Sequence, residues 1–366
     1  MAMISGGRAA GGSAPVSAGG SSGEGAVRAW LLLVALLVFA MIVVGGATRL
    51  TDSGLSITEW QPLLGAIPPL GEAHWLEAFE KYKQIPEYHL VNKGMSLDEF
   101  KFIYWWEWSH RFLGRFIGVA FALPLVVFAA LGKLPRGLAP KLVGILALGA
   151  LQGFFGWYMV KSGLVERIDV SHYRLALHLA TAFLILALLV WTALDIGARP
   201  AAIRLVTVKP GHRRIAWALV GLVMAQVVLG ALVAGLKAGL TYNTWPLMDG
   251  RLVPNGLFTL EPWFVNFFEN ITTVQFDHRL VAYLVVGLAV WNAFALRGVD
   301  DERIVQSATV LAIATLVQMG LGIWTLLSAQ GAIPIGLGLA HQGGAAIVLA
   351  IAVWHLHRVL RSPARG

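Results

Sequence analysis

The sequence predicts an all-α integral membrane protein: eight transmembrane helices that form two tandem four-helix bundles, related by a pseudo-two-fold axis along the membrane normal. Three observations predict this fold. Of the 366 residues, 57% are hydrophobic and only 13% are charged, whereas soluble domains carry about 25% charged residues. Eight apolar runs are long enough to cross a bilayer of about 30 Å. The last four runs repeat motifs of the first four.

The elements follow in order along the chain. Residues 1–28 are rich in Gly, Ser and Ala, which predicts a disordered cytoplasmic tail, and they lack the apolar segment of a signal peptide. The predicted spans are residues 29–48, 113–132, 141–160, 174–195, 214–236, 280–297, 304–327 and 337–357.

The charges of the connecting segments predict the orientation. Basic residues collect in short cytoplasmic loops, and the segments GKLPRGLAPK, ARPAAIRLVTVKPGHRR and LHRVLRSPAR are short and basic. We therefore expect both termini in the cytoplasm. The formal net charge of +8 then reflects membrane orientation rather than nucleic-acid binding.

The halves have the same plan. A long outer loop follows the first span of each, at 49–111 and 237–278. Four spans is an even number, so both halves share one orientation, as in repeats related by an axis along the membrane normal. The predicted domains are residues 29–196, a cytoplasmic linker at 197–213, residues 214–360 and a cytoplasmic tail at 361–366.

Four histidines belong to the repeat. His110 in EWSHRFLGR matches His278 in QFDHRLVAY, and His178 in HLATA matches His341 in AHQGGA. Each half thus offers two histidines at similar depth on two helices, near the outer side. This arrangement suits a flat macrocycle inside a bundle, with imidazole available to its iron from each face.

Two alternatives remain for these histidines. They could form hydrogen bonds between helices, or bind a non-heme metal, which would need a third ligand such as a carboxylate. The other histidines are interpreted as structural; they are His74, His89, His172, His212, His355 and His357. The chain has no cysteine, which excludes disulfides and thiolate metal sites.

Glu107 makes the halves unequal. It precedes His110 by three residues, so the two share a helix face if that helix begins early. Its counterpart is Gln275, which cannot ionise. The difference suggests a reacting heme in the first half and a resident heme in the second. Alternatively, Glu107 only pairs with Arg111 at i,i+4.

Four arginines lie near the outer membrane surface and are candidates to bind the anionic propionates of heme. They are Arg49, Arg111, Arg115 and Arg279. The competing interpretation is that their side chains reach toward lipid headgroups. A transporter is disfavoured, because transporters place polar groups near the bilayer midplane and here they gather at the outer edge.

The chain resembles the heme A synthase family. The resemblance rests on GGATRLTDSGLSITEWQPLLGAIPP, EWSHRFLGR, LQGFFGWYM, HLATA, DHRLVAY and AHQGGA, and it covers roughly residues 30–360. It implies oxidation of a methyl group of heme O to a formyl group, giving heme A for terminal cytochrome oxidases. Lacking cysteine, the chain is similar to the branch found in proteobacteria and mitochondria.

The resemblance also implies roles for residues. His110 and His178 would bind the iron of the substrate, heme O, with Glu107 as the catalytic acid. His278 and His341 would bind the iron of a heme b cofactor. Implied partners are heme O synthase (protoheme farnesyltransferase), an electron donor and the lipid membrane, and the sequence is compatible with a homo-oligomer. The expected location is a bacterial inner membrane, with the heme sites toward the periplasm. A diheme b-type electron-transfer protein is the alternative function.

Overall fold

The structure, a computed structural model, describes residues 22–61, 64–164, 169–197 and 208–361. Within these ranges eight helices are long and apolar enough to cross a membrane, which confirms the all-α membrane fold. They are α1 (Ser22–Leu50), α4 (Leu97–Ala130), α5 (Leu138–Lys161), α6 (His172–Gly197), α7 (Pro210–Gly235), α9 (Ile271–Ala295), α10 (Glu302–Leu327) and α11 (Ile335–Leu360). The shorter α-helices are α2 (Glu72–Tyr82), α3 (Pro86–Leu90) and α8 (Asn266–Glu269).

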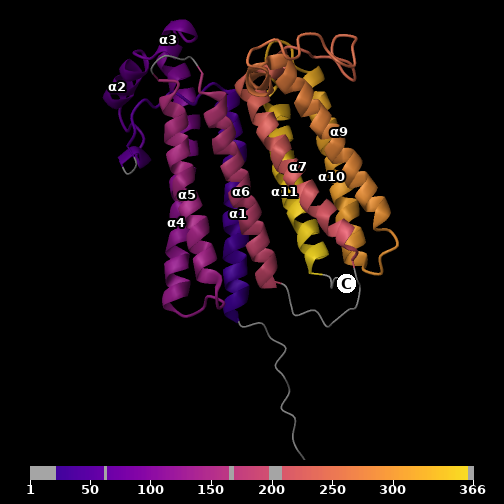
Figure 1. The fold of residues 1–366 in the computed structure, drawn as a ribbon. Coiled ribbons are helices and arrows are strands. Elements are labelled where there is room, and N and C mark those ends of the chain that lie inside the picture. The colour runs from indigo at the N-terminus through magenta and orange to yellow at the C-terminus, as the bar shows by residue number, and fades with distance from the viewer. Residues whose placement is uncertain (1–21, 62–63, 165–168, 198–207, 362–366) are drawn as a thin grey trace, which may run out of the picture.

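The long helices form two groups side by side (Figure 1). In the first group α1 packs on α4, α4 on α5, α5 on α6 and α6 on α1. In the second, α7 packs on α9, α9 on α10, α10 on α11 and α11 on α7. The contacts of one group therefore repeat those of the other when α1, α4, α5 and α6 are matched to α7, α9, α10 and α11.

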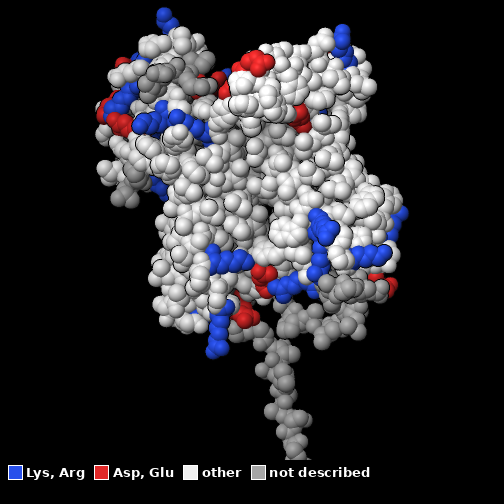
Figure 2. Space-filling view, viewed as in Figure 1, with Lys and Arg blue, Asp and Glu red and all other residues white. Residues whose placement is uncertain are grey.

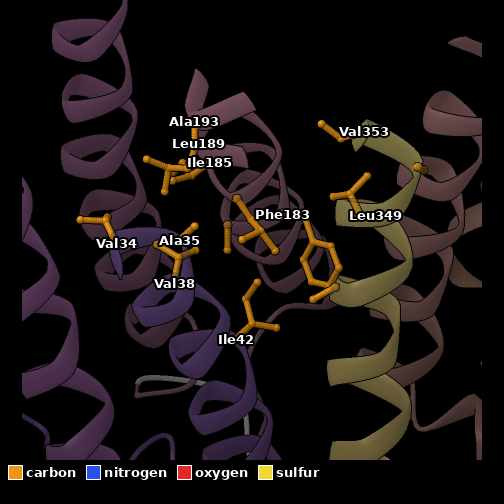
Figure 3. Close-up of a cluster of buried hydrophobic side chains, with 14 of the residues drawn as sticks. Val34, Ala35, Val38, Ile42, Phe183, Ile185, Leu189, Ala193, Leu349 and Val353 are labelled. Atoms are coloured by element: carbon orange, nitrogen blue, oxygen red, sulfur yellow. The ribbon is translucent and has the colours of Figure 1, made fainter. Parts of the chain in front are cut away.

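The contacts between the groups are consistent with a two-fold relation. Helix α1 packs on α11, α6 packs on α7, and α6 packs on α11. If α1 is exchanged with α7 and α6 with α11, the contact of α1 with α11 becomes the contact of α7 with α6. The contact of α6 with α11 stays the same. Buried side chains of α1, α6 and α11 fill this interface (Figure 3); among them are Val34, Ala35, Val38, Ile42, Phe183, Ile185, Leu189, Ala193, Leu349 and Val353.

Helix α4 begins much earlier than the predicted span at 113–132. The Ser96 side chain accepts a hydrogen bond from the Glu99 backbone, and the Glu99 carboxylate accepts one from the Ser96 backbone. This capping box starts the helix at Leu97. The extra turns are buried by α2, which packs Phe79 and Tyr82 against Phe100. The outer loop predicted at 49–111 thus contains α2, α3 and the first turns of α4.

A proline interrupts the hydrogen bonding of α4 without leaving a polar group unsatisfied. Pro124 lacks an N–H, so the Ala120 carbonyl four residues earlier has no partner within the helix. The Trp30 indole N–H of α1 donates to that carbonyl at 2.8 Å. Because lipid offers no replacement hydrogen bond, this contact lets α4 continue through the bilayer and fixes α1 beside it.

The predicted termini and linker fall largely outside the described residues. Of the predicted tail 1–28, residues 22–28 belong to α1, which therefore starts about two turns before residue 29. Of the linker 197–213 the structure describes Gly197 and 208–213, and of the tail 361–366 only Arg361. Helix α1 begins and α11 ends at the same end of the bundle (Figure 1). On the face shown in Figure 2, charged side chains gather near both ends, with a band of uncharged residues between them.

Candidate functional site

Two of the repeated histidines face each other inside the second group of helices. His278 lies on α9 and His341 on α11, each less than two turns from the helix N-terminus. Their ring centroids are 6.4 Å apart and their planes make an angle of 83°. Both helices start at the end of the bundle opposite to the start of α1, which is the outer end in the predicted orientation, so the imidazoles meet at that end.

The first group contains the matching pair. His178 lies on α6 at the same distance from the helix start as His341 on α11. His110 lies further along its helix, because α4 extends outward beyond the position at which α9 begins. His110 lies near His178, as His278 lies near His341. The structure therefore brings each predicted pair together.

Each of the four histidines faces a glycine on a neighbouring helix. A Cβ atom on Gly45 would lie 3.1 Å from His110 Nε2, and one on Gly156 would lie 3.1 Å from His178 Cε1. The corresponding distances are 3.2 Å from Gly230 to His278 Cε1 and 2.8 Å from Gly322 to His341 Cε1. Any larger residue would displace the imidazole, so these glycines fix the space in which each ring lies.

The histidine pair in the second group fits an iron porphyrin. Two axial imidazoles are separated by two metal–nitrogen bonds of about 2 Å and by roughly 1 Å from each nitrogen to its ring centre, so their centroids lie about 6 Å apart. The 6.4 Å between His278 and His341 matches this spacing. Among the described residues, no three His, Cys, Asp or Glu side chains lie together as a non-heme metal site would require.

Glutamines support three of the four histidines. Gln152 Nε2 donates to the His178 carbonyl at 3.0 Å, and Gln318 Nε2 donates to the His341 carbonyl at 2.7 Å. Gln226 Nε2 donates to the His278 carbonyl at 2.9 Å. In each case the same amide nitrogen lies 3.0 to 3.4 Å from a ring nitrogen of the histidine.

Glu107 is the buried anchor of the loop that follows α1. Its side chain is 3% exposed. One carboxylate oxygen accepts from the Ile57 backbone N–H at 2.6 Å and from the Ser56 hydroxyl at 2.7 Å. The other accepts from Arg111, so the predicted i,i+4 ion pair is present. A role in chemistry must coexist with this structural one.

In the second group a glutamine holds the corresponding loop, and it donates a hydrogen bond where Glu107 accepts them. Gln275, the counterpart of Glu107, donates from Nε2 to the Tyr242 carbonyl at 3.0 Å. Arg279 donates to the same carbonyl at 2.7 Å, as Arg111 donates to the Ile57 carbonyl at 2.8 Å. The loop after the first span of each half is therefore held by an arginine one residue after the histidine, and only the first half adds a carboxylate.

The four predicted propionate-binding arginines have protein partners. Arg111 and Arg279 bind loop carbonyls, and Arg115 donates to the Gln61 carbonyl at 3.0 Å. Arg49 pairs with Asp52 at 3.2 Å and with Asp169 at 3.3 Å. The Nε atoms of Arg49 and Arg279 are buried and have no hydrogen-bond partner among the described residues.

The histidines outside the repeat lie elsewhere. His74 and His89 are exposed on α2 and α3. His172 approaches Glu269 at 3.5 Å, and His357 approaches Asp195 at 3.1 Å. His355 is fully buried between Asn292 and Ser307, and His212 is half-buried at the start of α7.

Fold and site together define a polytopic membrane protein with two matched pairs of histidines, each pair placed between helices of one four-helix group. Within that class, the chain belongs to the cytochrome oxidase assembly protein family (COX15-CtaA), whose profile matches residues 28–353. A protein named heme A synthase from Parvibaculum lavamentivorans is 54% identical over 92% of this chain and 95% of its own length. A protein of the same name from a Chelativorans species is 55% identical across 90% of this chain and 90% of its own length. One from Mesorhizobium japonicum is 52% identical across 90% of this chain and 89% of its own length.

Two features of the site escaped prediction. The first is the set of three glutamines, Gln152, Gln226 and Gln318, that donate to the carbonyls of His178, His278 and His341. The second is the set of four glycines that face the histidines. A signal for both exists in the sequence, because the segments MIVVG, QGFFG, QVVLG and QMGLG each end in a glycine that faces a histidine.

Proposed function

We propose that this protein is a heme A synthase, an enzyme that oxidises a methyl group of heme O to a formyl group and so supplies heme A to a terminal cytochrome oxidase. The support for the reaction is the likeness to relatives of that name, which extends over nine-tenths of both chains. The site adds independent support, because a porphyrin substrate and a porphyrin cofactor require two sites of one kind.

In this proposal the two histidine pairs have different occupants. His110 and His178 hold the iron of heme O, the substrate, and His278 and His341 hold a resident heme b. The observation that carries the proposal is the 6.4 Å between the His278 and His341 ring centroids, a separation at which both imidazoles could bind one iron ion. When bound, heme b supplies a carrier for single electrons.

Glu107 is the proposed catalytic group of the first half. It holds the Ile57 N–H and the Ser56 hydroxyl beside His110, and its carboxylate is the feature that Gln275 cannot reproduce. We assign it the task of holding or moving a proton at the substrate methyl group. Arg49, Arg111, Arg115 and Arg279 are proposed to stabilise propionates; Nε of Arg49 and of Arg279 are donors suited to this task.

The proposed setting is a bacterial inner membrane with both termini in the cytoplasm. The basic segments between α4 and α5 and after α11 support this orientation. The histidine pairs then lie toward the periplasm. Heme O would arrive from heme O synthase, and the four-electron oxidation of a methyl to a formyl group requires a separate electron acceptor or donor system.

Extraction and mass analysis of hemes from the purified protein tests the proposal. The protein is expressed in hosts with and without a heme O synthase. We expect heme b under both conditions, and heme A or a hydroxylated heme O only when heme O is supplied. Heme b alone under both conditions would overturn the proposal and favour a diheme electron-transfer protein.

A further inference from the structure

The four histidines are opposed by one repeated five-residue segment, and one copy of it differs. The segments start at Met41 on α1, Gln152 on α5, Gln226 on α7 and Gln318 on α10. Each ends, one helical turn later, in the glycine that faces a histidine. Position one is therefore glutamine opposite His178, His278 and His341, but methionine opposite His110.

The glutamines are placed to restrain the imidazoles. Each donates from Nε2 to the carbonyl of its histidine, which fixes the amide one turn from the ring. The same amide nitrogen lies 3.0 to 3.4 Å from a ring nitrogen of the histidine, so each glutamine contacts both the backbone and the ring of its histidine. Polar neighbours of a metal-binding imidazole fix the orientation of its ring.

Met41 cannot do this. Its thioether has no hydrogen to donate and is a weak acceptor. Its Cε lies 3.0 Å from the position of a Cβ on Gly114, so the side chain lies on α4 one turn from His110. The residue matching Gly114 in the second half is Ala282, four residues after His278. The pair Met41 and Gly114 thus replaces the pair Gln226 and Ala282.

We propose that Met41 and the three glutamines are positioning residues that set how firmly each histidine holds its heme. His278 and His341 each have a glutamine, so the second half retains its heme. His110 has none, so it is the ligand that releases the iron when substrate enters and product leaves. This inference rests on the proposed function, because it requires hemes at both histidine pairs.

Reciprocal variants test it. Met41→Gln gives His110 the amide that the other histidines have, and Gln226→Met removes the amide from His278. The purified proteins, loaded with heme O and heme b, are mixed with excess apomyoglobin, and heme transfer is followed by absorbance. Loss of such an outer partner costs about 10- to 100-fold in metal affinity. We therefore expect heme O to leave Met41→Gln 10- to 100-fold more slowly, and heme b to leave Gln226→Met faster by the same factor.

A matched control separates this effect from that of an added amide in the membrane. Met224 lies two residues before Gln226, on another face of α7, where it packs against the apolar core. Met224→Gln should leave both transfer rates unchanged. If Met41→Gln does not fold, the double variant Met41→Gln/Gly114→Ala is used, because it reproduces the residues Gln226 and Ala282 of the second half. The variant Gln226→Met tests the inference independently of both.

The outcomes separate the inference from the proposed function. Wild-type protein that binds no heme at all would contradict the function. Wild-type protein that binds two hemes, together with unchanged transfer rates in both reciprocal variants, would overturn the inference and leave the function standing. Optical spectra provide a second readout, because a weakened axial ligand shifts the absorbance bands of the affected heme even where activity is unaltered.

Discussion

At the level of single residues, Glu107 and Gln275 occupy matching positions and do opposite things. Glu107 accepts hydrogen bonds from Ile57 N–H and Ser56, whereas Gln275 donates to a carbonyl. A glutamine at 107 keeps the shape but removes the charge that Arg111 and the N–H groups satisfy. The carboxylate is therefore both a loop anchor and, in the proposed reaction, a proton carrier.

We predict that Glu107→Gln retains both hemes and forms little heme A. Loss of general acid–base assistance lowers rates by about 10²- to 10⁴-fold, while a lost charged hydrogen bond costs only about 1.5–3 kcal/mol of stability. Heme content, thermal unfolding and heme A yield are measured together. Ser56→Ala is the control, since it removes one hydrogen bond to Glu107 and leaves the charge. Equal loss of activity in both variants would reduce Glu107 to an anchor, and full activity of Glu107→Gln would remove it from the mechanism.

The glycines that face histidines lead to a second prediction. Gly322→Ala places a Cβ 2.8 Å from His341 Cε1. Overpacking of this kind costs about 1–3 kcal/mol, so heme b should bind roughly ten- to a hundredfold more weakly. Gly320 on the same helix has nothing within 4 Å of its Cβ position, which makes Gly320→Ala the matched control. Heme titration of both variants gives the answer; equal affinities would mean that the His341 ring has room to shift.

At the scale of helices, hydropathy predicted the spans but not their outer ends. Residues 97–112 contain charged residues and tryptophans, so α4 was predicted to begin near residue 113. The capping box of Ser96 and Glu99 was visible in the sequence, but its use depends on α2, which buries Phe100. The pairing of histidines could be predicted because it repeats. The difference at Met41 is also present in the sequence, where MIVVG differs from QGFFG, QVVLG and QMGLG at its first residue, but only the structure shows that each of these segments faces a histidine.

Helix α3 contributes a pH dependence. Burial raises the pKa of Glu87 to about 8, the carboxylates of Asp52, Glu107 and Asp169 add to the rise, and the hydrogen bond from Tyr82 opposes it. The folded protein therefore binds this proton more tightly than the unfolded chain does. Stability is highest below the ordinary value of 4.5, falls as the pH rises toward about 8, and is constant above that.

We predict that Glu87→Gln removes this decline. Each pH unit between 5 and 8 lowers the free energy of unfolding of the wild type by at most roughly 1.4 kcal/mol. The stability of the variant relative to the wild type should therefore increase steadily over this range. Thermal unfolding at four pH values across this range is the measurement. Glu80→Gln, an exposed carboxylate on α2, is the control. Parallel curves for Glu87→Gln and wild type would mean that the α2–α3 region does not unfold with the rest of the protein.

For the whole molecule, polar contacts join the two helix groups at three levels. At the outer end Lys237 pairs with Asp169 at 2.8 Å, and Tyr173 donates to Glu269 at 2.7 Å. About two turns further in, next to His341, Gln342 donates to the Ile42 carbonyl at 2.6 Å. The apolar interface between α1, α6 and α11 lies on the same boundary (Figure 3). The groups are therefore fixed relative to one another, as electron transfer between two hemes would require.

At the inner end, Asp195 forms the third set of polar contacts between the two helix groups. Asp195 on α6 accepts from Arg361 at 2.9 Å and pairs with His357 of α11 at 3.1 Å and with Lys141 of α5 at 3.2 Å. It lies near the opposite end of α6 from His178. Asp195→Asn should lower the free energy of unfolding by about 1–3 kcal/mol and leave heme content and spectra unchanged, because the histidine pairs are held by outer contacts. Asp300→Asn, on an exposed loop at the same end, serves as the control for stability. Loss of heme from Asp195→Asn would show instead that closure of the inner end sets the geometry of the outer sites, so that the two groups respond as one body.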